Sequence, residues 1–236
     1  MNVSEISEKI VGERCRKVSE ERIAFNRTMA PTSMKVLGVT SPQLKELLKQ
    51  WLPVIKNLSD KDWIELAKQL VDTRIFECNQ LAFELLSKNK KALELIGLQD
   101  IEYLGKNIDN WATVDALAVM VSGRAWRENQ VSDQAVLNWL NSENRWWRRL
   151  ALVSTIPLNL KSRGGKGDPE RTLMLCEKVV SDRDDMIVKA LSWALRELSK
   201  SRRDDVSRFM KKYEDKLAAR VKKEVSTKLA TGKKNG

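Results

Sequence analysis

The chain has 236 residues, 42% of them hydrophobic and 32% charged, with a formal net charge of +11 and no histidine. This balance excludes a disordered chain, and no apolar run approaches the roughly 18 residues of a membrane span. The missing histidine excludes Ser-His and Cys-His nucleophile arrangements. The positive charge predicts a polyanionic partner, most often nucleic acid, because positive potential attracts phosphates; a solvated basic surface is the alternative.

The N-terminus begins with MNVSEISEKIVGERCRK, an amphipathic stretch of mixed charge that is unlike a secretion signal. We therefore expect a cytosolic protein without membrane contact, associated with the nucleoid when it is bound to DNA.

A helix is predicted over SPQLKELLKQWL, with Ser41 as its N-cap and Pro42 at its first helical position. The same apolar spacing, opened by a polar or acidic residue, recurs in four later segments. They are DKDWIELAKQLV (60–71), FECNQLAFELLSK (76–88), DQAVLNWLN (133–141) and DMIVKALSWALRELSK (185–200). Because there is no alternating apolar run with hairpin turn signals, the sequence predicts an all-α fold.

The segment NIDNWATVDALAVM, residues 107–120, predicts a buried helix that carries both Trp111 and Asp115. Side chains four positions apart lie on the same face of a helix, so one face must hold an indole and a carboxylate. Four other tryptophans are interpreted as core residues, the usual position of an aromatic in a helical bundle. They are Trp51, Trp63, Trp126 and Trp139.

The sequence resembles itself at a fixed interval. LAFELL from Leu81, DALAVM from Asp115 and RLALVS from Arg149 follow one another at offsets of 34 residues, and KALSWA from Lys189 follows after 40. We attribute the surplus to the loop LKSRGGKGDP, which we interpret as a flexible connection and not as a phosphate-binding loop. Such a period predicts an α-solenoid of antiparallel helix pairs, HEAT-like because the TPR pattern is missing. Generic similarity between amphipathic helices is the alternative.

We predict one HEAT-like domain over residues 1–236. Residues 1–35 form N-terminal helices, 36–200 the core repeats, and 201–236 basic C-terminal helices with a short tail. No heptad seam is visible, so we expect a monomer. The cysteines Cys15, Cys78 and Cys176 are scattered and lack metal-ligand spacing, which predicts reduced, packed thiols and no metal site.

The repeat register predicts a stripe of functional residues. Asp115, Arg149 and Lys189 occupy the same position in successive repeats, so a solenoid would align them along its concave surface, forming a basic groove for DNA. Trp111 precedes Asp115 by four positions and Trp193 follows Lys189 by four, so both indoles flank this stripe.

The segment NRWWRRLAL lies in the middle of the stripe. It places Trp147, Arg148 and Arg149 together with Trp146, and such aromatic and guanidinium groups stack on bases and grip a phosphate backbone.

Three motifs, NWATVDAL, NRWWRRLAL and VKALSWALRE, resemble the AlkD-like family of DNA alkylation repair glycosylases. The resemblance extends from MKVLGVTSPQLKELLK through SWALREL and so covers most of the chain. It implies a HEAT-like fold that acts on duplex DNA containing alkylated bases. It further implies hydrolytic excision of cationic purines such as 3-methyladenine and 7-methylguanine, without a cofactor.

The resemblance also implies roles for individual residues. Trp111, Asp115 and Trp193 match the family's active site, and Arg149 and Arg196 match its phosphate-contacting arginines. Two features depart from the family. Asparagine precedes Trp111 where relatives often have a second tryptophan, and Trp147 with Arg148 makes the middle motif bulkier and more basic.

The chemistry suits these residue types. An alkylated purine is already cationic and leaves readily, so the enzyme must stabilise the positive charge that develops on the sugar. A fixed carboxylate such as Asp115 does this and orients the water, and indole faces favour a cation. The family grips the backbone without a dedicated pocket for a flipped base. Two alternatives are a non-catalytic protein that binds damaged, bent or branched DNA and, less favoured, a protein-interaction scaffold.

Overall fold

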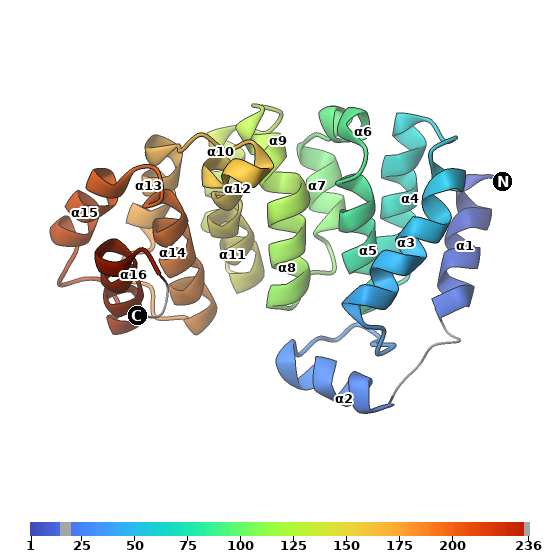
Figure 1. The fold of residues 1–236 in the computed structure, drawn as a ribbon, viewed down its shortest axis with the longest axis horizontal. Coiled ribbons are helices and arrows are strands. Elements are labelled where there is room, and N and C mark those ends of the chain that lie inside the picture. The colour runs from blue at the N-terminus through green and yellow to red at the C-terminus, as the bar shows by residue number, and fades with distance from the viewer. Residues whose placement is uncertain (15–19, 234–236) are drawn as a thin grey trace. The chain divides into compact units, whose positions relative to one another are not determined.

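The computed structural model describes residues 1–14 and 20–233, and their regular structure is helical (Figure 1). Within these ranges no β-strand occurs, and the one β-type contact is an isolated bridge between Lys35 and Ile75. The predicted all-α fold is confirmed. None of the described helices is long and apolar enough to cross a membrane.

The chain divides into two compact units, residues 1–121 and 122–236. The division falls inside a π-helical turn, η1 (Ala118–Ser122), so no linker composition marks it in the sequence. Each unit is described below by itself.

The helices of the first unit pack as successive pairs, as in an α-solenoid. Helix α4 packs against α5, α5 packs against α8, and α1 and α3 cover α4 and α5. Four core leucines, two from each of α4 and α5, are essentially inaccessible to solvent: Leu66, Leu70, Leu81 and Leu85. The helices are α1 (Val3–Arg14), α2 (Glu20–Met29), α3 (Ser41–Ile55), α4 (Asp60–Asp72), α5 (Phe76–Leu86), α6 (Lys90–Leu95), α7 (Leu98–Leu104) and α8 (Trp111–Leu117).

The second unit is built in the same way around α14, which packs against α11, α13 and α16 (Figure 1). Leu191, Ala194 and Leu195 of α14 are buried at its centre. Its elements are α9 (Gly123–Arg127), α10 (Asp133–Leu140), α11 (Arg145–Val153), α12 (Ile156–Asn159), η2 (Lys161–Arg163), α13 (Pro169–Lys178), α14 (Asp185–Leu198), α15 (Arg203–Lys212) and α16 (Ala219–Thr231).

The predicted repeat register corresponds to helix starts. Asn110, Asn144 and Asp184 are the N-caps of α8, α11 and α14, and in each case the side-chain oxygen accepts a backbone N–H of the first turn. The caps follow the same intervals of 34 and 40 residues as the repeats. A short polar side chain at these positions fixes where each helix begins, because it satisfies a donor that has no partner within the helix.

The residues that lengthen the last repeat interval from 34 to 40 lie only in part where the sequence predicted them, in the loop before α13. Helix α10 begins at Asp133 and α13 at Pro169, an interval close to the repeat, whereas α11 begins at Arg145 and α14 at Asp185. The loop before α13 therefore supplies little of the extra length. Most of it lies in α13, which is longer than α10, and in the turn that follows it.

The predicted N-cap of α3 is wrong by one residue. Thr40, in extended conformation, is the cap: its side chain accepts the N–H of Gln43, and the Gln43 side chain accepts the N–H of Thr40 at 2.8 Å. Ser41 is instead the first helical residue. This reciprocal capping box satisfies two backbone donors, which a serine cap at Ser41 would not achieve.

The predicted core residues are confirmed. Trp51, Trp63, Trp126 and Trp139 are all buried. Cys78 and Cys176 are also buried, whereas Cys15 lies outside the described residues. Burial raises the pKa of the Cys176 thiol far above its ordinary value, because the thiolate would lose its hydration.

Candidate active site and nucleic-acid interface

Helix α8 begins where the predicted active-site motif begins. The Asn110 side chain is fully buried and accepts the N–H of Thr113 at 3.0 Å, which sets Trp111 in the first turn. Val114 and Leu117 point into the core, whereas Trp111 and Asp115 are partly exposed. The indole and the carboxylate thus share the accessible side of one short helix, one turn apart.

Trp111 is held in place by the last residue of α2 and by the segment that follows it. Its indole Nε1–H donates a hydrogen bond to the backbone oxygen of Met29 at 2.7 Å. The ring packs against an apolar cluster formed by Ala30, Met34, Val36 and Phe76. Since the polar edge and part of the ring are already engaged, only the remaining surface of the indole is available to a substrate.

Asp109 ties that same segment to the start of α8. Its carboxylate accepts hydrogen bonds from Thr32 Oγ1 and from the Ser33 N–H, both at 2.5 Å, and from Asn110 Nδ2 at 3.0 Å. Burial by itself raises the pKa of Asp109, but the hydrogen bonds from Thr32, Asn110 and Ser33 outweigh it and lower the pKa below its ordinary value.

The lowered pKa of Asp109 predicts that the stability contributed by this carboxylate depends on pH. A carboxylate with a depressed pKa in the folded state contributes stability that is fully present above its ordinary pKa of 3.8 and is lost as the pH falls through the folded-state value. We expect the melting temperature of Asp109→Asn to lie below that of the wild type near neutral pH. The two should converge once the pH has fallen below 3.8 and through the lowered folded-state pKa of Asp109, because the wild-type side chain is then also uncharged. A difference that stays constant from neutral to acidic pH in thermal melts would contradict this.

Trp193 lies on α14, in the second unit. Asp184 caps this helix by accepting the N–H groups of Met186 and Ile187, and Lys189 and Trp193 follow four positions apart. Trp193 is partly exposed beside the buried Ser192 and Ala194. Because Trp111 and Asp115 belong to the first unit, the meeting of the three predicted catalytic residues at one site stays a prediction.

The two arginines predicted on α11 are engaged within the second unit. Arg149 is only 5% exposed, and its Nη1 donates to the backbone oxygen of Met186 at 2.6 Å, which links α11 to the first turn of α14. Arg148 pairs with Asp182 at 3.5 Å. Arg149 therefore has a structural role in addition to its predicted contact with phosphate.

The two cations predicted on α14 are also paired. Lys189 contacts Asp185 at 2.6 Å. Arg196 donates to Ser192 Oγ at 3.2 Å and lies 3.4 Å from Glu224 of α16. Burial lowers the pKa of Arg196, although Glu224 opposes this. A phosphate that binds here must compete with the carboxylates already in place.

Trp147 has a partner in the core. Its ring lies 5.8 Å from that of buried Trp139, with the planes inclined by 41°. Trp147 is partly exposed, so its predicted contact with DNA concerns the part of the ring that Trp139 leaves open. The neighbouring Trp146 carries the Arg145 guanidinium 5.0 Å from its ring centre.

The sequence profile of the family described as DNA alkylation repair enzyme matches residues 16–229. The chain belongs to the DNA alkylation repair enzyme family. The match spans almost the whole chain, both units included, and it confirms the resemblance found in the three motifs. No curated protein matches the sequence.

In this repair enzyme the loop between α12 and α13 is packed, so its interpretation as a flexible connection is wrong. The N–H groups of Gly165 and Gly167 donate to the backbone oxygens of Leu160 and Leu158 at 3.1 and 3.2 Å. A Cβ on Gly165 would lie 2.6 Å from the backbone oxygen of Pro157. Glycine here permits close backbone approach, a use that composition alone does not distinguish from flexibility.

A buried carboxylate near the Trp111 cluster was missed in the sequence. Glu77 of α5 is fully buried and accepts the N–H groups of Leu37, Gly38 and Val39 at 3.0, 2.8 and 3.2 Å. It anchors the strand-like segment that leads into α3. The available signal was an acidic residue between Phe76 and Cys78 in the segment FECNQLAFELL, because a carboxylate requires a partner if it is buried.

Proposed function

We propose that this member of the DNA alkylation repair enzyme family is a DNA glycosylase that excises cationic alkylated purines, 3-methyladenine and 7-methylguanine, from duplex DNA. The observation that carries the proposal is the pair on α8: an accessible carboxylate, Asp115, one turn from Trp111, whose ring is fixed by the Met29 carbonyl and an apolar cluster. The enzyme acts as a monomer in base excision repair and needs no cofactor.

The reaction is a hydrolysis. The bond between C1′ of deoxyribose and the purine nitrogen breaks, and its electron pair leaves with the base, which becomes neutral. Water adds to C1′ and loses a proton to Asp115 or solvent, leaving an abasic site. Asp115 stabilises the positive charge on the sugar and orients the water, while Trp111 and Trp193 favour the cationic sugar with their ring faces.

The cations of α11 and α14 hold the phosphate backbone in this proposal. Arg148, Lys189 and Arg196 exchange their carboxylate partners for phosphates. Arg149 contacts phosphate while it keeps its bond to the Met186 carbonyl, and Trp147 contacts the duplex beside them. The positive charge of the alkylated base makes it a good leaving group and so distinguishes it from normal bases. The base therefore need not enter a dedicated pocket.

The test is release of free base from methylated duplex DNA under single-turnover conditions, with chromatographic detection of 7-methylguanine and 3-methyladenine. We expect both to appear, with an abasic site for each. Tight, salt-sensitive binding without release would instead favour a non-catalytic protein that recognises damaged or bent DNA.

A further inference from the structure

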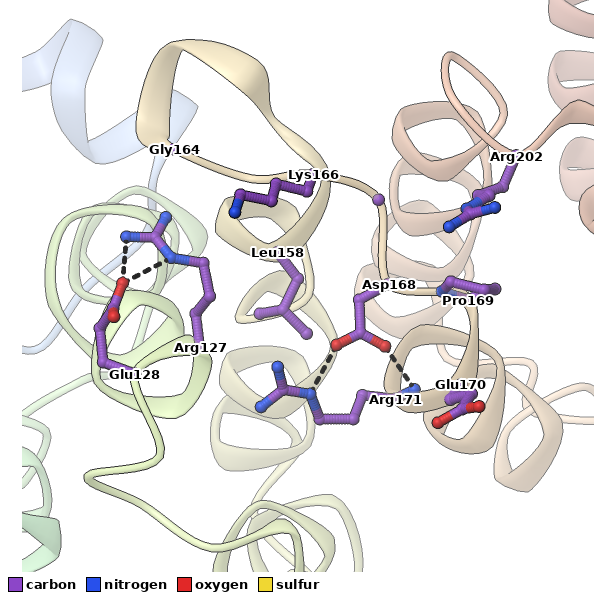
Figure 2. A pocket seen from close by; sticks show the side chains of 11 residues that line it. Arg127, Glu128, Leu158, Gly164, Lys166, Asp168, Pro169, Glu170, Arg171 and Arg202 are labelled. Carbon is purple, nitrogen blue, oxygen red and sulfur yellow. Dashed lines mark hydrogen bonds and ion pairs between the residues drawn. The ribbon is translucent and has the colours of Figure 1, made fainter.

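The second unit contains a cavity whose lining includes none of the residues proposed for catalysis. A cavity of about 550 Å³ opens between the end of α9, the loop before α13, the first residues of α13 and the turn before α15 (Figure 2). Its lining is mostly polar and charged, and four of its side chains are cationic. These are Arg127, Lys166, Arg171 and Arg202.

Two of these cations have no carboxylate partner in the part of the chain that the structure describes. Lys166 and Arg202 are exposed, and neither makes an ion pair or a side-chain hydrogen bond with residues 1–14 or 20–233. Figure 2 shows that Lys166 comes from the loop, with its side chain extending toward the side of Arg127, and that Arg202 comes from the turn before α15. This contrasts with Arg148, Lys189 and Arg196, which are all paired.

Most of the negative charge of the lining is already neutralised. Asp168 accepts from Arg171 Nε at 2.6 Å and also caps α13 by accepting the Arg171 N–H at 3.0 Å. Glu128 pairs with Arg127 at 2.8 Å. Glu170, in the first turn of α13, is the remaining carboxylate, and it makes no ion pair with the described residues. Among the described residues, two unpaired cations and one unpaired carboxylate therefore line the cavity.

The packed loop fixes the backbone of Lys166 next to that of Arg202. Gly167 adopts a φ of +88° and lies so close to Ser201 that a Cβ there would be 2.4 Å from Ser201 Oγ. Lys166 and Arg202 are the neighbours of these two residues, so the contact fixes their backbones against each other. On the far wall, the Arg127 guanidinium donates to the backbone oxygens of Pro157 and Arg163. The cavity is thus built before any ligand arrives, which reduces the entropy lost on binding.

We propose that this cavity binds a phosphate group and that Lys166 and Arg202, its two unpaired cations, supply the charge for it. The phosphate comes either from the backbone of a DNA strand beyond the α11 and α14 face, or from a free phosphate. A phosphate fits because its several oxygens can accept hydrogen bonds from an ammonium and from a guanidinium. The inference goes beyond the proposed function, because it does not depend on base release.

The experiment measures binding and not activity. The double variant Lys166→Gln/Arg202→Gln is compared with wild type for affinity to an unmodified duplex across a series of salt concentrations, and for binding of inorganic phosphate by calorimetry. The control Lys45→Gln/Lys49→Gln removes the same charge from exposed positions of α3 in the other unit. The variant Glu170→Gln changes the charge of the cavity in the opposite direction, because it removes the unpaired carboxylate from the lining.

If backbone phosphate is the ligand, the slope of log affinity against log salt should fall by about 0.9 for each lost contact, roughly 1 to 2 in total, and more than in the control. Glu170→Gln should tighten DNA binding. If free phosphate is the ligand, the double variant should lose binding of inorganic phosphate while its DNA slope matches the control. A double variant that matches the control in both measurements overturns the proposal, whether or not the protein is a glycosylase.

Discussion

Asp115→Asn is expected to slow the release of alkylated purines by roughly 10²- to 10³-fold, the loss typical when one preorganised electrostatic group is removed from a transition state. The substitution deletes the negative charge that faces the developing cation on the sugar, yet it keeps the volume and shape of the side chain. Asp115 is partly exposed on α8 and the core contacts of that helix come from Thr113, Val114 and Leu117, so the fold should be retained. DNA binding should be equal or slightly tighter, because a carboxylate no longer repels phosphates.

The measurement is the single-turnover rate of 7-methylguanine release, with affinity for the same duplex determined in parallel. Glu46→Gln is the matched control, since it removes one negative charge from an exposed position of α3 in the same unit. The control should react at the wild-type rate. Wild-type release by Asp115→Asn, in a protein that still binds DNA, would end the mechanism proposed here and move the charge stabilisation to another group.

Glu77→Ala is expected to lower the free energy of unfolding by about 3 kcal/mol or more. The substitution leaves the N–H groups of Leu37, Gly38 and Val39 without their acceptor in a buried position, and each unsatisfied buried donor costs about 1–3 kcal/mol. For a chain of this size, the melting temperature should fall by roughly 6–12 °C. The segment that seats Trp111 continues directly into these residues, so base release should fall as well.

Thermal and denaturant unfolding measure this effect. Glu77→Gln keeps one carbonyl acceptor but brings an amide donor toward other N–H groups. Its free energy of unfolding should therefore fall by less than that of Glu77→Ala. Glu84→Ala serves as the control, because Glu84 lies on the same helix and is partly exposed. Equal, small losses for Glu77→Ala and Glu84→Ala would mean that water replaces the carboxylate at no cost.

The local structure was determined by the sequence itself. Helical spacing of apolar residues predicted α3, α4, α5, α10 and α14, and the core positions of four tryptophans followed from the same pattern. Repeated caps at Asn110, Asn144 and Asp184 agree with the repeats found by self-comparison. These signals act over one or two helical turns, so they can be read without knowing which helices meet. The family membership, too, followed from short motifs.

Only the tertiary structure decided what surrounds the predicted site. Trp111 donates to the carbonyl of Met29, Asp109 holds Thr32, and Glu77 holds the backbone of Gly38, all across long separations in the chain. The pairing of charges was also decided by the tertiary structure, because Arg149 and Arg196 have partners on neighbouring helices. Lys166 and Arg202 line a cavity that no sequence motif predicts. Composition counts charges and glycines, but whether a cation is paired or a glycine is packed depends on which segments the fold brings together, and that is set by long-range packing.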